Sequence, residues 1–205
     1  MKNKLKKKIV VGITGGIGSG KSIVSDIIES SGYYVIRTDL LAKQLMTSNK
    51  SLVKKIKKAF SNESYKDEHI NTNILAKKVF DNKLNLKKLN LLVHPLVIKE
   101  IKKQIKYQHL FNKVVFVESA LIYEAKIEAM FDFIVLVFSK KPKRIKRIRK
   151  RDGLTTSEII KRMKMQLPDL QKKSIAHFVI ENNTSVKSLE RKAKFLINLI
   201  SSFES

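Results

Sequence analysis

Eight consecutive residues near the start of the chain have the types and the spacing needed to hold a phosphate. Residues 15–22, Gly-Gly-Ile-Gly-Ser-Gly-Lys-Ser, match the phosphate-loop pattern G-x-x-x-x-G-K-[ST]. Glycines let backbone N–H groups curl around phosphate oxygens, and the N-terminus of a following helix adds partial positive charge. In such loops the lysine, here Lys21, bridges the β- and γ-phosphates, and the hydroxyl of Ser22 ligates Mg²⁺. The pattern predicts a nucleoside triphosphate site and leaves the phosphate acceptor open. The residues expected to line it are Gly16, Ile17, Gly18, Ser19, Gly20, Lys21, Ser22 and Ile23.

Two carboxylates stand at the ends of predicted strands. Asp39 lies just past residues 33–36, and Glu118 ends residues 114–117. Ligands of an open parallel sheet bind outside the carboxyl ends of its strands, so we expect Asp39 to face the loop from a neighbouring strand end. A carboxylate there can accept the proton of an attacking hydroxyl, but Asp39 could equally cap the next helix. Glu118 is the natural acid to support Mg²⁺, its alternative being a solvated strand-end charge.

A strongly basic segment follows the strand predicted at residues 133–138. Nine of the twelve residues from Lys140 to Arg151 are Lys or Arg, and Arg147 shares a helix face with Arg151. Arginines placed there can close over a triphosphate and neutralise charge that develops during transfer. A nucleic-acid patch and a merely solvated helix are the alternatives.

A capping box at residues 155–158 follows the basic segment. It predicts a helix through Leu167 on which Arg162 and Gln166 share a face. Together the two segments predict an inserted helical lid.

These residues need a scaffold of alternating strands and helices. Apolar runs predict strands, helical spacing predicts helices at both ends of the chain, and Pro95 is predicted to sit in the first turn of a helix. Nearly continuous apolar strands separated by helices indicate an α/β fold with a parallel sheet covered by helices on both faces. The predicted strands are residues 9–14, 33–36, 114–117, 133–138 and 178–180, and the clearest helices are residues 22–31 and 186–200, with mostly helical spacing over 40–107.

Composition excludes several classes of protein. The 205 residues contain no cysteine, which rules out disulfides, cysteine-ligated zinc and a thiol nucleophile. No apolar run approaches the ~18–20 residues needed to cross a bilayer, and the lysine-rich residues 1–8 are not followed by an apolar signal segment. We therefore expect a cytoplasmic protein without a membrane partner. The net charge of +25 suits an anionic partner but also follows from lysine-rich composition, so it does not by itself predict nucleic-acid binding.

In their order and intervals, these motifs resemble the dephospho-coenzyme A kinase family over almost the whole chain. The phosphate loop alone is common to many kinases, whereas the ordered set is far more specific. The matching segments are residues 14–22, Gly32-Tyr-Tyr-Val-Ile-Arg-Thr-Asp39, Leu92-Val-His-Pro-Leu96, Glu118-Ser-Ala-Leu-Ile-Tyr-Glu124, Arg147-Ile-Arg-Lys-Arg-Asp-Gly153, Arg162-Met-Lys-Met-Gln166 and Val179-Ile-Glu-Asn-Asn183.

The resemblance implies ATP-dependent phosphorylation of the ribose 3′-hydroxyl of dephospho-coenzyme A, with Mg²⁺ as cofactor. It implies a P-loop nucleoside triphosphate hydrolase fold with a five-stranded parallel sheet, built as one domain over residues 1–205. The expected parts are a core (8–39, 112–139 and 176–205), a helical acceptor-binding region (40–111) and a lid (140–175). The partners are ATP and dephospho-coenzyme A, and the chain is expected to be a monomer or a weak homo-oligomer.

The resemblance to the family also implies roles for individual residues of this chain. Asp39 takes the place of the family's base, and Lys21 and Ser22 take the phosphate and Mg²⁺ roles. Arg147 becomes a lid contact to phosphate, catalytic with Asp39 and Lys21, and Asn182 joins the ATP site. The acceptor would contact Asp39, His94 and Arg162, although the His94-Pro95 pair fits a helix start equally well.

The chain departs from the family pattern at several positions. Arg37 stands where the pattern has a first aspartate, and Glu118 and Ala120 stand where aspartate and proline are usual. Ile175 and His177 replace an arginine and an aspartate. Two rivals remain: another P-loop kinase for a nucleotide or sugar acid, and a basic nucleic-acid-binding protein that uses ATP as a switch. A GTPase is disfavoured because no Asn-Lys-x-Asp motif occurs.

Overall fold

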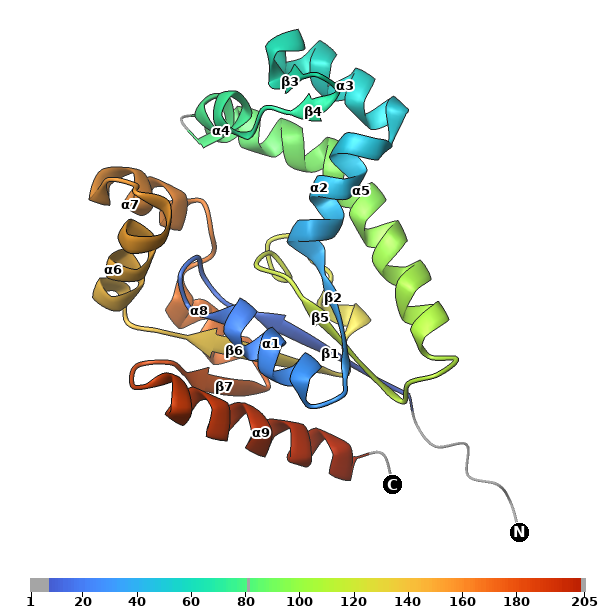
Figure 1. Cartoon of the computed structure of the whole chain (residues 1–205), viewed down its shortest axis with the longest axis vertical. Helices are drawn as coiled ribbons and strands as arrows, with labels where there is room; N and C mark the ends of the chain where they lie inside the picture. The colour runs from blue at the N-terminus through green and yellow to red at the C-terminus, as the bar shows by residue number, and fades with distance from the viewer. Residues whose placement is uncertain (1–7, 81, 204–205) are drawn as a thin grey trace. The chain divides into compact units, whose positions relative to one another are not determined.

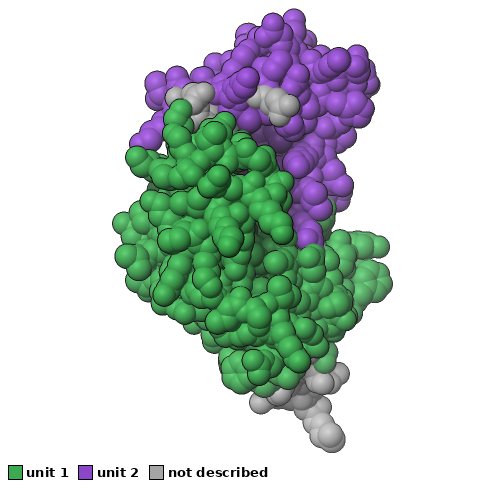
Figure 2. All heavy atoms as spheres, turned by 60° about the vertical axis from the view of Figure 1, so that its left-hand side comes forward, with its two compact units in different colours: residues 1–36, 104–205 green, residues 37–103 purple. Residues whose placement is uncertain are grey.

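The computed structural model describes residues 8–80 and 82–203, so the lysine-rich start at residues 1–7 lies outside the described part. The chain divides into two compact units, residues 1–36 with 104–205 (unit 1) and residues 37–103 (unit 2), coloured green and purple in Figure 2. Within the described part, no helix is long and apolar enough to cross a membrane.

Unit 1 is built on a five-stranded parallel sheet (Figure 1). Its strands have the spatial order β2-β5-β1-β6-β7, which confirms the predicted sheet and all five predicted strands. Since β5 lies between β1 and β2, the prediction that the strand before Asp39 neighbours the strand of the phosphate loop is wrong. The strands are β1 (Ile9–Thr14), β2 (Tyr34–Arg37), β5 (Val114–Glu118), β6 (Phe133–Phe138) and β7 (Phe178–Glu181).

The sheet is buried on both faces: successive side chains of a strand point to opposite sides, and every residue of β1 is buried. In β1, Ile9, Val11 and Ile13 pack into the core formed with α1 (Lys21–Ser30) and α9 (Val186–Ser202). The opposite face carries Gly12, whose missing Cβ leaves room for Ile122 and the ring of Phe131. Burial on both faces explains the nearly continuous apolar runs.

Three helices are inserted between β6 and β7, where the sequence predicted two; the third, α8, was not predicted. They are α6 (Lys141–Asp152), α7 (Thr156–Lys164) and α8 (Asp169–Ile175). The capping box is confirmed: the Thr155 hydroxyl accepts from the Glu158 N–H, and the Glu158 carboxylate accepts from the Thr155 N–H at 2.8 Å.

The end of α7 differs from the prediction. The helix stops at Lys164 instead of Leu167, because the N–H groups of Met165 and Gln166 bond three residues back in a tightened last turn. Gln166 therefore does not share a helix face with Arg162.

Unit 2 is mainly helical. Its elements are α2 (Thr38–Ser48), α3 (Lys50–Phe60), the 3₁₀ turn η1 (Asn62–Ser64), the strand pair β3 (Tyr65–Lys66) and β4 (His69–Ile70), α4 (Thr72–Phe80) and most of α5 (Lys83–Gln108); a further 3₁₀ turn, η2 (Glu128–Met130), belongs to unit 1. The strand pair was not predicted because each strand has only two residues.

The prediction for Pro95 is wrong: it lies inside α5 rather than in the first turn of a helix. The helix begins much earlier, where the Asn82 side chain accepts from the N–H groups of Leu84 and Asn85. Inside a helix, Pro95 cannot donate the hydrogen bond of its turn, which weakens the helix there.

Candidate active site

The predicted phosphate loop joins β1 to α1. Gly20 has φ 100° at the start of α1, and a Cβ there would lie 2.2 Å from the Asn182 side-chain nitrogen, so only glycine fits. Lys21 is 9% exposed, and its Nζ donates to the Gly15 carbonyl at 2.9 Å, which holds the ammonium inside the loop. Among the described residues, the buried hydroxyl oxygens of Thr14 and Ser19 have no hydrogen-bond partner.

The two predicted Mg²⁺ residues meet beside this loop. Glu118, at the end of β5, is in register with Ile13 of β1. The Ser22 hydroxyl donates to Glu118 Oε1 at 3.1 Å, and Glu118 is only 8% exposed. Glu118 is therefore a buried partner of the loop, and its alternative as a solvated charge is wrong. A hydroxyl beside one carboxylate fits Mg²⁺, which binds few protein oxygens and keeps its water and phosphate ligands.

Arg147 and Asn182, two of the residues predicted to bind ATP, contact each other beside the loop. The Arg147 Nη2 donates to the backbone oxygen and side-chain Oδ1 of Asn182, at 3.0 and 3.2 Å. Asn182 Nδ2 donates in turn to the Ser19 carbonyl at 2.8 Å, and Arg147 Nη1 reaches the Gly18 and Ser19 carbonyls at 3.4 Å. Arg151, which shares the predicted face, instead pairs with Asp152 at the surface.

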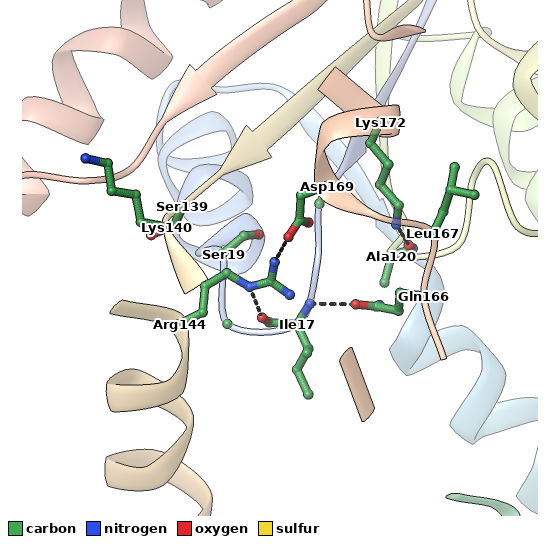
Figure 3. A network of polar contacts seen from close by, with 12 residues as sticks. Ile17, Ser19, Ala120, Ser139, Lys140, Arg144, Gln166, Leu167, Asp169 and Lys172 are labelled. Carbon is green, nitrogen blue, oxygen red and sulfur yellow. Dashed lines mark hydrogen bonds and ion pairs between the residues drawn. The ribbon is translucent and has the colours of Figure 1, made fainter. Parts of the chain in front are cut away.

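Two residues of the inserted segment, Arg144 and Gln166, reach the loop without having been predicted. The Gln166 side chain accepts from the Ile17 N–H at 2.9 Å, and Arg144 Nε donates to the Ile17 carbonyl at 2.7 Å (Figure 3). Arg144 also forms an ion pair with Asp169 of α8. Burial lowers the pKa of the Arg144 guanidinium, and Asp169 opposes that shift, so the group stays charged. One sequence signal was available: Arg144 lies four residues before Ile148 and so shares its buried face of α6.

A second buried ion pair fixes α8. Lys172 is 0% exposed, and its Nζ contacts Glu124 Oε1 at 2.7 Å and donates to the Ala120 carbonyl at 3.3 Å. The same Glu124 oxygen accepts from the Leu167 N–H at 2.8 Å. Removing one partner of a buried pair typically costs ~3–5 kcal/mol, so α8 is firmly attached to the segment after β5.

The other predicted site residues lie in different places. Asp39 is exposed in the first turn of α2, whose N-cap position is Arg37, so its predicted alternative as the capping residue is wrong. His94 is half-buried within α5, which excludes its alternative as a helix start. Both belong to unit 2, whereas Arg162 lies in the last turn of α7 in unit 1. The roles of these three residues toward an acceptor stay predictions.

Comparison with known proteins decides the family. The family model described as dephospho-CoA kinase matches residues 9–188. The chain belongs to the dephospho-CoA kinase family. A dephospho-CoA kinase of Carboxydothermus hydrogenoformans is 34% identical over 181 residues, covering 87% of this chain and 88% of that protein.

Solved structures agree with this assignment. The protein TT1252 of Thermus thermophilus has a TM-score of 0.78 at 33% identity, covering 94% of this chain and 98% of its own. The dephospho-CoA kinase of Campylobacter jejuni has a TM-score of 0.63 at 28% identity, covering 94% and 97%. The chain thus has the P-loop kinase fold, and the predicted fold class is confirmed.

Three residues that depart from the dephospho-CoA kinase pattern can be placed in the structure. The ring of His177 accepts from the Ile134 N–H through Nδ1 at 3.1 Å, so this residue helps to join β7 to β6. Ala120 offers its carbonyl to Lys172, and Ile175 is exposed at the end of α8. None of these three departures falls within the loop residues 15–22.

Proposed function

We propose that this chain transfers the terminal phosphate of ATP to the ribose 3′-hydroxyl of dephospho-coenzyme A, giving coenzyme A and ADP. Its membership of the dephospho-CoA kinase family carries the proposal. The buried Lys21 and the Ser22–Glu118 pair support it, because they place at the start of α1 and the end of β5 the charge and oxygen ligands that phosphoryl transfer needs. The predicted cytoplasmic location and oligomeric state stay predictions.

Catalysis would consist of positioning and charge neutralisation. Loop N–H groups and the Lys21 ammonium bind the phosphates, and Lys21 compensates negative charge on the transferred group. Arg147, anchored by Asn182, adds a second positive charge at the loop. Ser22 and Glu118 would hold Mg²⁺, which when bound neutralises charge on the β- and γ-phosphate oxygens.

The acceptor contacts are proposed from the family pattern at Asp39, His94 and Arg162. Asp39 would accept the proton of the attacking hydroxyl, which makes that oxygen a better nucleophile. His94 and Arg162 are proposed to contact the acceptor, where a guanidinium suits its phosphates.

One measurement tests the reaction directly. ADP release, followed by a coupled assay, should depend on dephospho-coenzyme A and be far slower with AMP, CMP, shikimate or gluconate as acceptor. Turnover with one of those acceptors but not with dephospho-coenzyme A would instead identify another P-loop kinase.

Helices α6 and α7 of the inserted segment are proposed to close as a lid over bound substrates. Hydrogen exchange should show slower exchange in α6 and α7 when ATP and dephospho-coenzyme A are both present, because closure buries their backbone N–H groups. We expect little change in α8, which the Lys172–Glu124 pair already holds, and none in α9. Slowing of α6 by RNA and not by the substrates would favour the nucleic-acid rival.

A further inference from the structure

The tip of the phosphate loop is held from outside by side chains of distant segments. Arg144 donates to the Ile17 carbonyl, while Asn182 and Arg147 donate to the Ser19 carbonyl. A trans peptide is planar, and its carbonyl and the following N–H point in opposite directions. Fixing these two carbonyls therefore turns the N–H groups of Gly18 and Gly20 toward the other side of the loop.

These two N–H groups are available to an anion. Among the described residues, no acceptor takes the N–H of Gly18 or Gly20, whereas the N–H of Ser19 is used within the loop by the Gly16 carbonyl at 3.1 Å. Successive N–H groups turned to one side form a concave anion site. The orientation of the Ile17–Gly18 peptide is thus part of the phosphate site.

Arg144 is well placed to control that peptide. It is 3% exposed, and its Nη2 would lie 2.3 Å from a Cβ at Gly16, so the guanidinium rests directly on the loop backbone. Its ion pair with Asp169 fixes its direction, and α8, which carries Asp169, is anchored by the buried Lys172 (Figure 3). Gln166 holds the N–H of the same Ile17.

We infer that Arg144, held by Asp169, is a positioning residue: it keeps the Ile17–Gly18 peptide turned so that the Gly18 N–H faces a nucleotide phosphate. This inference rests on the proposed ATP site. Such a positioning role differs from a direct role in transfer, because the loop N–H groups cradle the inner phosphates, which ADP and ATP both carry. ADP binding should therefore depend on Arg144 as strongly as ATP binding does.

Titration with fluorescent ADP and ATP analogues tests this inference. Arg144→Met should weaken both analogues by roughly ten-fold or more, since hydrogen bonds from charged groups are the stronger ones. The KM for ATP should rise, and the KM for dephospho-coenzyme A should stay constant. Arg149→Met, an exposed arginine on the same helix, is the matched control and should bind as the unaltered chain does.

A charge-balanced double variant separates positioning from simple electrostatics. Arg144→Met leaves Asp169 uncompensated near the loop, which by itself repels phosphate. Arg144→Met with Asp169→Asn removes both charges and leaves no uncompensated charge at the pair, so this variant also serves if the single one does not fold. Its ADP affinity should remain roughly ten-fold weakened.

Three results would overturn the inference: recovery of ADP affinity in the double variant, weakening of ATP but not ADP, or unchanged binding of both. Failure of the unaltered chain to bind either analogue would instead contradict the proposed function and the ATP site itself.

Discussion

Replacing Lys21 by alanine should reduce phosphoryl transfer by at least roughly 10²–10³-fold, because a preorganised charge is lost where negative charge develops. The buried ammonium lies inside the loop, bonded to the Gly15 carbonyl, and no other described lysine or arginine donates to that carbonyl. Initial rates of ADP release at saturating ATP and dephospho-coenzyme A measure the effect.

Lys187→Ala provides the control for this prediction. Lys187 is an exposed lysine on α9, so its loss changes the net charge equally without touching the loop. Turnover of Lys21→Ala close to that of Lys187→Ala would contradict the assignment of the ATP site.

Asp39→Asn should lower kcat by roughly 10²–10⁴-fold, the usual contribution of general-base assistance. Asparagine keeps the size of the side chain but cannot take up the acceptor proton. Asp39 is not expected to contact the ATP phosphates, so nucleotide affinity should change little. Steady-state kinetics in both substrates, with nucleotide titration, separates these quantities.

Arg37 provides a second test of Asp39. This arginine stands where the family pattern has an aspartate, two residues before the proposed base. Adding Arg37→Asp to Asp39→Asn asks whether a carboxylate at the neighbouring position can substitute, and partial recovery of kcat would support proton acceptance.

The Tm of Asp39→Asn distinguishes a role of Asp39 in catalysis from a role in the stability of α2. An aspartate in the first turn of a helix is favoured by the helix dipole, by ~0.3–1 kcal/mol. Full turnover of Asp39→Asn with a lowered Tm would mean that Asp39 serves α2 alone, and Glu118 would then be the next candidate base.

Much of the core could be predicted from local patterns. The strand β1, the loop at residues 15–22 and the start of α1 follow from a short apolar run, glycine spacing and helical periodicity. The capping box at Thr155 was equally predictable because both of its partners lie within one helical turn. Each of these features depends on residues close together along the chain.

The predictions that proved wrong concern places where contacts between distant residues outweigh local sequence signals. Pro95 indicated a helix start, but the helix begins at Lys83, and its apolar side chains Val93 and Val97 are buried on either side of the proline. Such burial outweighs one missing hydrogen bond. The strand before Asp39 could not be placed in the sheet, because the sequence does not state that β5 pairs with β1.

The sequence alone determined the residue types of the loop, and so the prediction of a phosphate site: Lys21, Ser22 and the glycines. Only the tertiary structure decided which side chains hold that loop in shape. Arg144 and Gln166 reach Ile17 across 127 and 149 residues of chain. Contacts over such separations leave no periodicity in the sequence. They form because the sheet order and the anchoring of α8 bring those segments together.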